Sequence, residues 1–130
     1  MIIALDFDGT MVTHDYPIVG REIPECVNVL TELLEQGHQF VLNTMRSDGR
    51  QDGTNPLTDA VNWFNERNIP LVGINENPTQ KNWTSSPKVY AELYIDDAAL
   101  GTPLQYWDNY GRPCVDWVKV RELLVADSIL

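Results

Sequence analysis

Two aspartates stand one residue apart where the first apolar run of the chain ends. The run "MIIAL" is followed at once by "DFDGT", which places Asp6 and Asp8 at its end and Gly9 and Thr10 directly after them. Carboxylates this close disfavour each other's ionised form, so they need either protons or a nearby cation. The segment is therefore a candidate for metal binding or for acid and base chemistry.

Polar side chains also follow two later apolar runs. They are Asn43, Thr44 and Arg46 after "QFVL", Asp96 and Asp97 after "AELYI", and Lys88, which precedes this second acidic pair. Four carboxylates at one site stay ionised only beside a cation. Magnesium prefers carboxylate and carbonyl oxygens and commonly takes its remaining ligands from phosphate. The sequence therefore predicts a Mg²⁺ site that draws on Asp6, Asp8, Asp96 and Asp97, with Lys88 offsetting part of their charge.

The elements that must bring these residues together alternate between strands and helices. We predict strands at residues 1–7, 39–44, 69–74 and 91–95, helices at 24–36, 57–67 and 116–126, and loops at 48–55, 76–87 and 101–113. Such alternation is typical of βαβ units. It predicts a three-layer α/β fold with a doubly wound, Rossmann-like parallel sheet and helices on both faces. Ligands of such sheets bind at the carboxyl ends of the strands, where the polar residues should meet.

Length and charge restrict the classes of partner. The chain has 130 residues, which suits a single domain over 1–130, and its net charge is −10, from 19 acidic residues and 9 scattered basic ones. This charge would repel a polynucleotide, so we expect no nucleic acid partner. No apolar run is long enough to cross a membrane, and the two cysteines lack metal-ligand spacing. These features favour a cytoplasmic protein without a membrane partner.

In their order and positions, these motifs resemble those of the haloacid dehalogenase superfamily of aspartate-nucleophile phosphohydrolases. "DFDGT" is similar to its first motif, the strand ending in "LNT" to its second, Lys88 to its third and "YIDD" to its fourth. The resemblance spans most of the chain. It implies a magnesium-dependent phosphomonoester hydrolase that works through an aspartyl-phosphate.

The resemblance also implies a role for each motif residue. Asp6 would attack phosphorus as an ionised carboxylate. Asp8 would protonate the leaving oxygen, deprotonate the attacking water and offer its backbone carbonyl to the metal. Thr44 would donate a hydrogen bond to the phosphoryl group, and Lys88 would hold that group and the nucleophile by charge.

Two of these assignments have alternatives. In the second acidic pair, Asp97 is the preferred direct ligand of magnesium and Asp96 its close support, but the two could exchange roles. Lys81 lies in the same loop region as Lys88 and is the alternative catalytic lysine.

Further residues near the motifs are candidates for binding substrate. Gly9 would let the chain turn beside the phosphate without a Cβ in the way. Thr10 and Asn43 would add hydrogen bonds to the substrate. Arg46 would either bind the far end of the substrate or be a solvated surface charge. His14, in the loop after the nucleophile, is expected to be a surface or loop residue that at most touches the substrate.

The chain leaves no room for a separate cap domain. The intervals from Asp8 to the first helix and from Thr44 to Asp96 are too short to hold one. The sequence thus resembles the capless branch of the superfamily, whose open site admits a large partner or is covered by a second subunit of a homo-oligomer. Residues 11–23 and 76–87 could act as partial lids. The expected substrate is a small phosphorylated metabolite, such as a sugar phosphate or a nucleotide.

Two other functions are compatible with an acidic site on this type of sheet. A phosphorylation-dependent receiver also uses an acidic magnesium site, but its acceptor aspartate ends a middle strand, whereas the second and third strands here end near Thr44 and Asn75. The other alternative is a non-catalytic binding module on the same scaffold. Because every residue of the hydrolase pattern is present, the hydrolase is the preferred interpretation.

Overall fold

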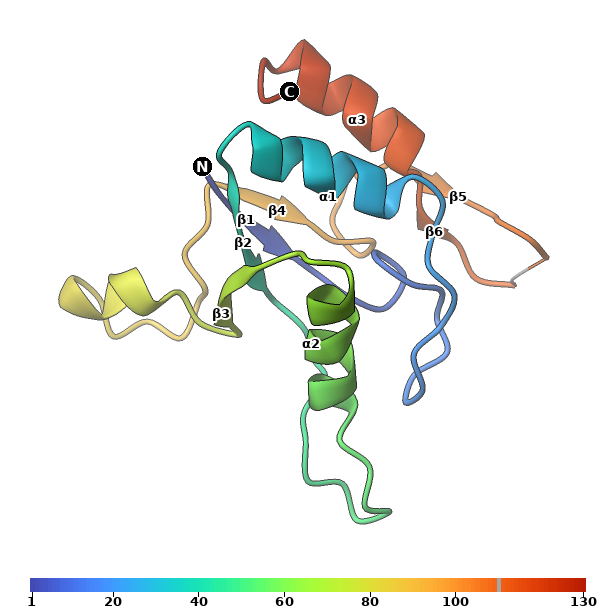
Figure 1. Cartoon of the computed structure of the whole chain (residues 1–130), viewed down its shortest axis with the longest axis vertical. Coiled ribbons are helices and arrows are strands. Elements are labelled where there is room, and N and C mark those ends of the chain that lie inside the picture. Colours follow the sequence, from blue (N-terminus) through green and yellow to red (C-terminus); the bar gives the residue numbers. More distant parts are fainter. Residues whose placement is uncertain (110) are drawn as a thin grey trace.

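The sheet of the protein has four parallel strands (Figure 1). The computed structural model describes residues 1–109 and 111–130. The strands are β1 (Ile2–Leu5), β2 (Gln39–Leu42), β3 (Leu71–Ile74) and β4 (Leu93–Ile95), in the spatial order β3-β2-β1-β4. The chain starts inside the sheet, builds outward to β3 and then crosses to β4 on the other side of β1, so the sheet is doubly wound. The predicted α/β class is confirmed.

Three helices pack on this sheet. They are α1 (Cys26–Glu35), α2 (Pro56–Glu66) and α3 (Trp117–Ala126), and α1 lies beside α3 (Figure 1). α1 forms where apolar residues recur at helical spacing, and it buries Cys26, Val29, Leu30 and Leu33. Asp116 caps the start of α3, and its side chain accepts a hydrogen bond from the backbone N–H of Lys119. Within the described residues, no helix has the length and apolar character needed to span a membrane.

The core lies between the three helices and one face of the sheet. Alternate strand residues point to opposite faces, and the residues facing this core are Ile3, Leu5, Phe40 and Leu42. Ala4 and Val41 are also buried but point to the second face. There the hydroxyl of Tyr94 donates to the carbonyl of Val89, in the connection between β3 and β4.

The second face of the sheet departs from the prediction of helices on both faces, because all three α-helices of the described residues share the core on the first face. The connection between β3 and β4 holds the 3-10 helix η1 (Pro78–Asn82), which Asn77 caps by accepting from the backbone N–H of Thr79. This connection has no apolar repeat at helical spacing, and Pro78 and Pro87 limit the segment that a helix could occupy. An irregular segment therefore takes the place of an α-helix.

A short hairpin joins the sheet region to α3. β5 (Leu104–Gln105) and β6 (Cys114–Val115) pair in antiparallel fashion; β5 lies within the predicted loop at 101–113, and β6 follows directly after it. The backbone N–H of Val115 donates to the carbonyl of Gly9 at 2.9 Å. This bond holds the hairpin against the loop that follows β1.

Candidate functional site

An open cavity of about 500 Å³ lies at the carboxyl ends of β1 and β4. Its lining includes six of the predicted site residues, namely Asp6, Asp8, Thr44, Arg46, Asp96 and Asp97. The backbone N–H of Asp6 donates to the carbonyl of Ile95 at 3.0 Å, which extends the pairing of the two strands beyond their ends. The sheet register therefore brings both acidic pairs to one place, as the sequence predicts.

Three carboxylates in this cavity form a cluster that suits a metal ion. Oxygen atoms of Asp6, Asp96 and Asp97 all lie within 4.8 Å of one another. Burial raises the pKa of Asp6 to about 8, with smaller raising contributions from the charge of Asp96 and from Asp97 and an opposing hydrogen bond from Thr10. Partly buried carboxylates are the ligands that a hard divalent cation prefers, so the donor set fits Mg²⁺.

Thr10 connects the two acidic strand ends from the protein interior. Its hydroxyl donates to Oδ2 of Asp6 at 2.7 Å and accepts from the backbone N–H of Asp97 at 3.1 Å. The residue is fully buried. Thr10 therefore orients Asp6 from the interior, and the predicted contact of Thr10 with substrate does not match its burial.

His14 pairs with Asp97 inside the cavity. Nε2 of His14 lies 2.8 Å from Oδ2 of Asp97, and both side chains are largely shielded from solvent. The pair sits directly over Gly9, whose φ is +81°. A Cβ at Gly9 would lie 2.5 Å from Oδ2 of Asp97 and closer still to Nε2 of His14. Glycine is thus required here by the His14–Asp97 pair.

Replacement of Gly9 by alanine should displace His14 and Asp97 and weaken Mg²⁺ binding by about 10- to 100-fold, the usual cost of losing a group that orients a metal ligand. Gly49→Ala is the matched control, because Gly49 has a similar φ of +75° and no atom within 4 Å of the added Cβ. Calorimetric titration with Mg²⁺ measures both variants. Equal affinities would show that the pair does not constrain the metal ligands.

The guanidinium of Arg46 donates all of its N–H groups to other parts of the protein, so none is left for a substrate. Nε and Nη2 donate to the two carboxylate oxygens of Asp8 at 2.8 and 2.7 Å. Nη1 donates to the carbonyls of Pro17 and Pro56, and Nη2 also donates to that of Ile18. These bonds use all five N–H groups of the guanidinium. Arg46 is buried, so neither predicted role, substrate binding or solvated charge, matches the structure; it positions Asp8.

Thr44 and Asn43 differ in what they offer the cavity. The backbone N–H of Thr44 donates to Oδ1 of Asn75 at 2.8 Å, and its hydroxyl accepts from the backbone N–H of Arg46. Among the described residues the Thr44 hydroxyl proton has no acceptor, so it can serve a phosphoryl oxygen. Asn43 continues the sheet by donating its backbone N–H to Leu5, and its side chain is not part of the cavity lining.

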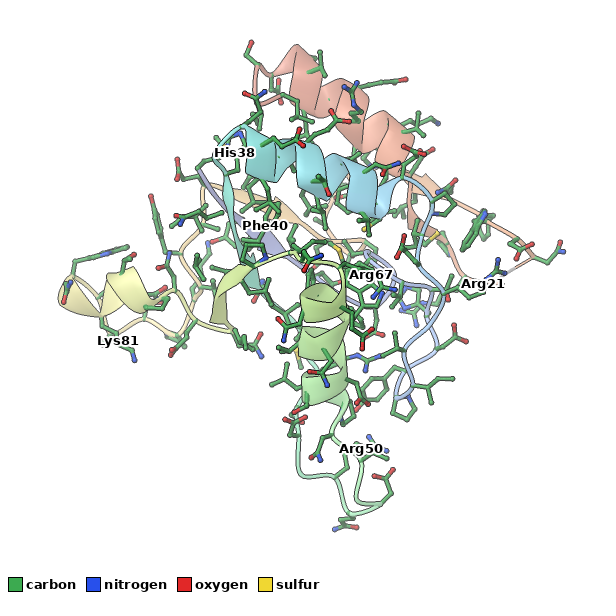
Figure 2. The ribbon with its side chains drawn as sticks, viewed as in Figure 1. Arg21, His38, Phe40, Arg50, Arg67 and Lys81 are labelled. Carbon is green, nitrogen blue, oxygen red and sulfur yellow. The ribbon has the colours of Figure 1, made fainter. Side chains whose placement is uncertain are left out.

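Neither candidate lysine reaches the acidic cavity. The backbone N–H of Glu92 donates to the carbonyl of Ile2 at 2.9 Å, so the chain enters β4 at the amino end of the sheet, opposite the cavity. Lys88 precedes that point, and its Nζ lies 5.7 Å from the centre of the Tyr94 ring. Lys81 lies on the 3-10 helix η1, away from α1, α2 and α3 (Figure 2), and pairs with Glu76 at 3.6 Å. The geometry does not support the catalytic role predicted for Lys88, nor Lys81 as its substitute.

Three side chains of the cavity, those of Tyr16, Met45 and Arg112, carried no functional signal in the sequence. They complete the described lining together with Ala98 and with His14, for which the sequence predicts at most a contact with substrate. His14 and Tyr16 come from the predicted lid at residues 11–23, whereas the other predicted lid, 76–87, contributes nothing to the described lining. Arg112 comes from the hairpin connection, whose strands of two residues each are too short to show a periodic pattern.

Comparison with known proteins gives one similar solved structure. It is that of a conserved protein coded by a locus of Bacteroides thetaiotaomicron, with 30% sequence identity, a TM-score of 0.76, and coverage of 98% of this chain and 91% of that chain. No family model matches the chain. No curated protein matches it either. The likeness supports the α/β fold and says nothing about activity.

Proposed function

The chain belongs to the same family as the conserved protein of Bacteroides thetaiotaomicron, and we propose that it is a magnesium-dependent phosphomonoester hydrolase. The observation that carries the proposal is the cluster of Asp6, Asp96 and Asp97 in an open cavity at the carboxyl ends of parallel strands. Asp8 and Thr44 line the same cavity. This set combines a nucleophile, a candidate acid and base, and a hydroxyl donor around a metal site.

In the first step, an oxygen of the Asp6 carboxylate forms a bond to phosphorus while the bond from phosphorus to the leaving oxygen breaks. Asp8 gives its proton to that oxygen, and the products are an aspartyl-phosphate and an alcohol. A carboxylate has about four lone-pair positions, so Asp8 can carry this proton while it accepts both bonds from Arg46. Thr44 donates its hydroxyl proton to a phosphoryl oxygen.

In the second step, water attacks the phosphorus of the aspartyl-phosphate and passes a proton to Asp8. The bond between phosphorus and Asp6 breaks, which returns the Asp6 carboxylate and releases inorganic phosphate. Magnesium, when bound by Asp6, Asp96 and Asp97, supplies positive charge that keeps these carboxylates ionised and offsets the charge of the phosphate.

The substrate class we favour is a small phosphorylated metabolite, such as a sugar phosphate or a nucleotide. The net charge of −10 disfavours a polynucleotide, and a cavity of about 500 Å³ can hold a small molecule. We place the protein in the cytoplasm, because both of its cysteines are unpaired and buried and a reducing compartment maintains free thiols. A second copy of the chain could cover the open cavity.

The test is release of inorganic phosphate from a panel of phosphomonoesters, with Mg²⁺ and with EDTA. Asp6→Asn should abolish turnover, because the amide is not a nucleophile, and EDTA should have the same effect on the parent protein. Asp59→Asn, a change of the same type on the exposed face of α2, should leave turnover unchanged. Turnover that persists in Asp6→Asn or in EDTA would contradict the proposed mechanism.

The position of Lys88 gives some weight to a second function, a phosphate-accepting receiver or binding module. A hydrolase needs positive charge at the transferring group, and Lys88 is not among the described residues that line the cavity. Incubation with a small phosphodonor and Mg²⁺, followed by intact mass measurement, separates the two functions. A stable phosphorylated adduct without turnover would favour the receiver, and an adduct that decays with phosphate release would favour the hydrolase.

A further inference from the structure

The acidic cavity requires a positive side chain that is available to a phosphoryl group. Asp6, Asp8, Asp96 and Asp97 all line it, and a phosphomonoester adds its own negative charge. In phosphoryl transfer, positive side chains act together with the metal to stabilise the charge on the oxygens of the transferring group. Because Lys88 is not among the described residues that line this cavity, another residue must supply that charge.

Two of the basic residues in the cavity are already occupied. All five N–H groups of Arg46 are donated within the protein, and Nε2 of His14 is paired with Asp97. Arg112 is exposed, and the structure shows no ion pair or hydrogen bond between its side chain and any described residue. Among the described residues of the lining, it is therefore the one permanent positive charge that can bind an anion.

The backbone places Arg112 at the nucleophile loop. Arg112 lies three residues before Val115, whose backbone N–H donates to the carbonyl of Gly9 at 2.9 Å. Nε1 of Trp117 donates to the carbonyl of Thr10 at 2.7 Å, and Trp117 is fully buried. These two bonds attach the end of the hairpin directly to the segment that carries Asp6 and Asp8.

The other arm of the hairpin connection is held as well. Arg21 forms an ion pair with Asp108, and its guanidinium lies 4.7 Å from the centre of the Trp107 ring. Figure 2 shows Arg21 at the side of the molecule where the hairpin lies. Described residues on both arms of the hairpin are thus bonded to the rest of the protein, and Arg112 lies in the lining of the cavity.

We propose that Arg112 binds the phosphoryl group of the substrate and supplies the positive charge that the sequence pattern assigns to Lys88. The inference rests on the proposed hydrolase function and names the residue that completes its site. A guanidinium stays charged at all physiological pH values and offers two parallel N–H donors to a phosphate. Its exposed position lets it approach a phosphate held at Asp6 and Thr44 without breaking an ion pair or hydrogen bond to any described residue.

Binding of inorganic phosphate, measured by calorimetry with saturating Mg²⁺, tests this role without relying on turnover. Arg112→Gln should weaken phosphate binding by at least about 10-fold, the loss of one hydrogen bond to a charged group. Arg112→Lys should recover part of the affinity, because lysine keeps the positive charge but lacks the two parallel N–H donors of the guanidinium. Arg121→Gln removes the same charge at a distant site where Arg121 pairs with Glu32, and it should bind phosphate as the parent does.

Steady-state kinetics on the hydrolysed phosphomonoester separates this inference from the proposed function. Full phosphate affinity and turnover in Arg112→Gln would overturn the role of Arg112 and leave the hydrolase standing. An inert parent protein that binds phosphate through Arg112 would overturn the hydrolase and support the site. Loss of phosphate binding in Lys88→Gln, with Arg112→Gln unaffected, would return the role to Lys88. A parent protein that binds no phosphate would overturn the inference.

Discussion

Replacement of Arg46 by methionine is expected to destabilise the protein by about 3 to 5 kcal/mol, the usual cost of removing one partner from a buried ion pair. The variant would leave the Asp8 carboxylate without its cation and the carbonyls of Pro17, Ile18 and Pro56 without their donors. Methionine is of similar length and fills most of the space. The loss of stability in Arg46→Met therefore comes mainly from the missing hydrogen bonds and charge, and less from an empty space in the protein.

Urea unfolding of the parent protein, Arg46→Met and Arg46→Lys measures this effect. Lysine keeps the charge but cannot donate to both oxygens of Asp8 and to three carbonyls, so it should recover only part of the loss. Arg121→Met serves as the control, because the ion pair of Arg121 with Glu32 is on the surface and its loss should leave the midpoint close to that of the parent. A loss below about 1 kcal/mol in Arg46→Met would mean that water replaces these contacts without penalty.

The parts of the site that depend on topology were predictable from the sequence. Asp6 and Asp96 each follow an apolar run, and the alternation of strands and helices implies parallel strands whose carboxyl ends share one edge. The structure brings both to that edge, within one cluster of carboxylates. No knowledge of side-chain contacts was needed for this result.

The roles of Arg46 and Thr10 could not be predicted, because they depend on partners that are distant in the sequence. Arg46 is 38 residues from Asp8 in the sequence. Thr10 is 87 residues from Asp97, whose backbone N–H donates a hydrogen bond to the Thr10 hydroxyl. A basic or hydroxyl residue near a strand end has the same sequence pattern whether it binds a ligand or another part of the protein. Only the folded arrangement decides between these two outcomes.

Lys88 and Arg112 show the same limit for the positive charge of the site. The position of Lys88 before the acidic pair predicts that it lies near this pair. The chain, however, enters β4 at the amino end of the sheet, as the bond from Glu92 to Ile2 shows, and Lys88 is not among the described residues that line the cavity. Arg112 lies in a connection with no periodic pattern. It reaches the cavity because Val115 is bonded to Gly9, a contact that no short-range signal encodes.

In the absence of metal, the protein should become less stable as the pH rises from about 4 to 8. Burial, assisted by Asp96 and Asp97, raises the pKa of Asp6 from 3.8 to about 8. Between these values the folded state binds a proton at Asp6 that the unfolded state has released. The free energy of unfolding therefore falls with rising pH, by up to about 1.4 kcal/mol per pH unit, and the fall ends above the folded pKa.

Thermal unfolding of the parent protein and Asp6→Asn in EDTA, at pH values from 5 to 8, isolates this effect. The asparagine does not titrate and can still accept from Thr10, so the difference between the two pH slopes belongs to Asp6. Parallel slopes would show that the folded protein holds Asp6 ionised without a metal.

Saturating Mg²⁺ should remove this slope, because the metal binds the ionised carboxylate in the folded state and competes with the proton. At 100 times its dissociation constant, an ion that binds only the folded state adds about 2.7 kcal/mol of stability. The gain should be larger at pH 8 than at pH 5 in the parent protein. In Asp6→Asn it should be smaller, because two carboxylates of the cluster remain, and it should lose most of this pH dependence, because the variant lacks Asp6, whose pKa burial raises to about 8. A gain independent of pH in the parent protein would place the ion away from Asp6, on acids that are ionised throughout this range.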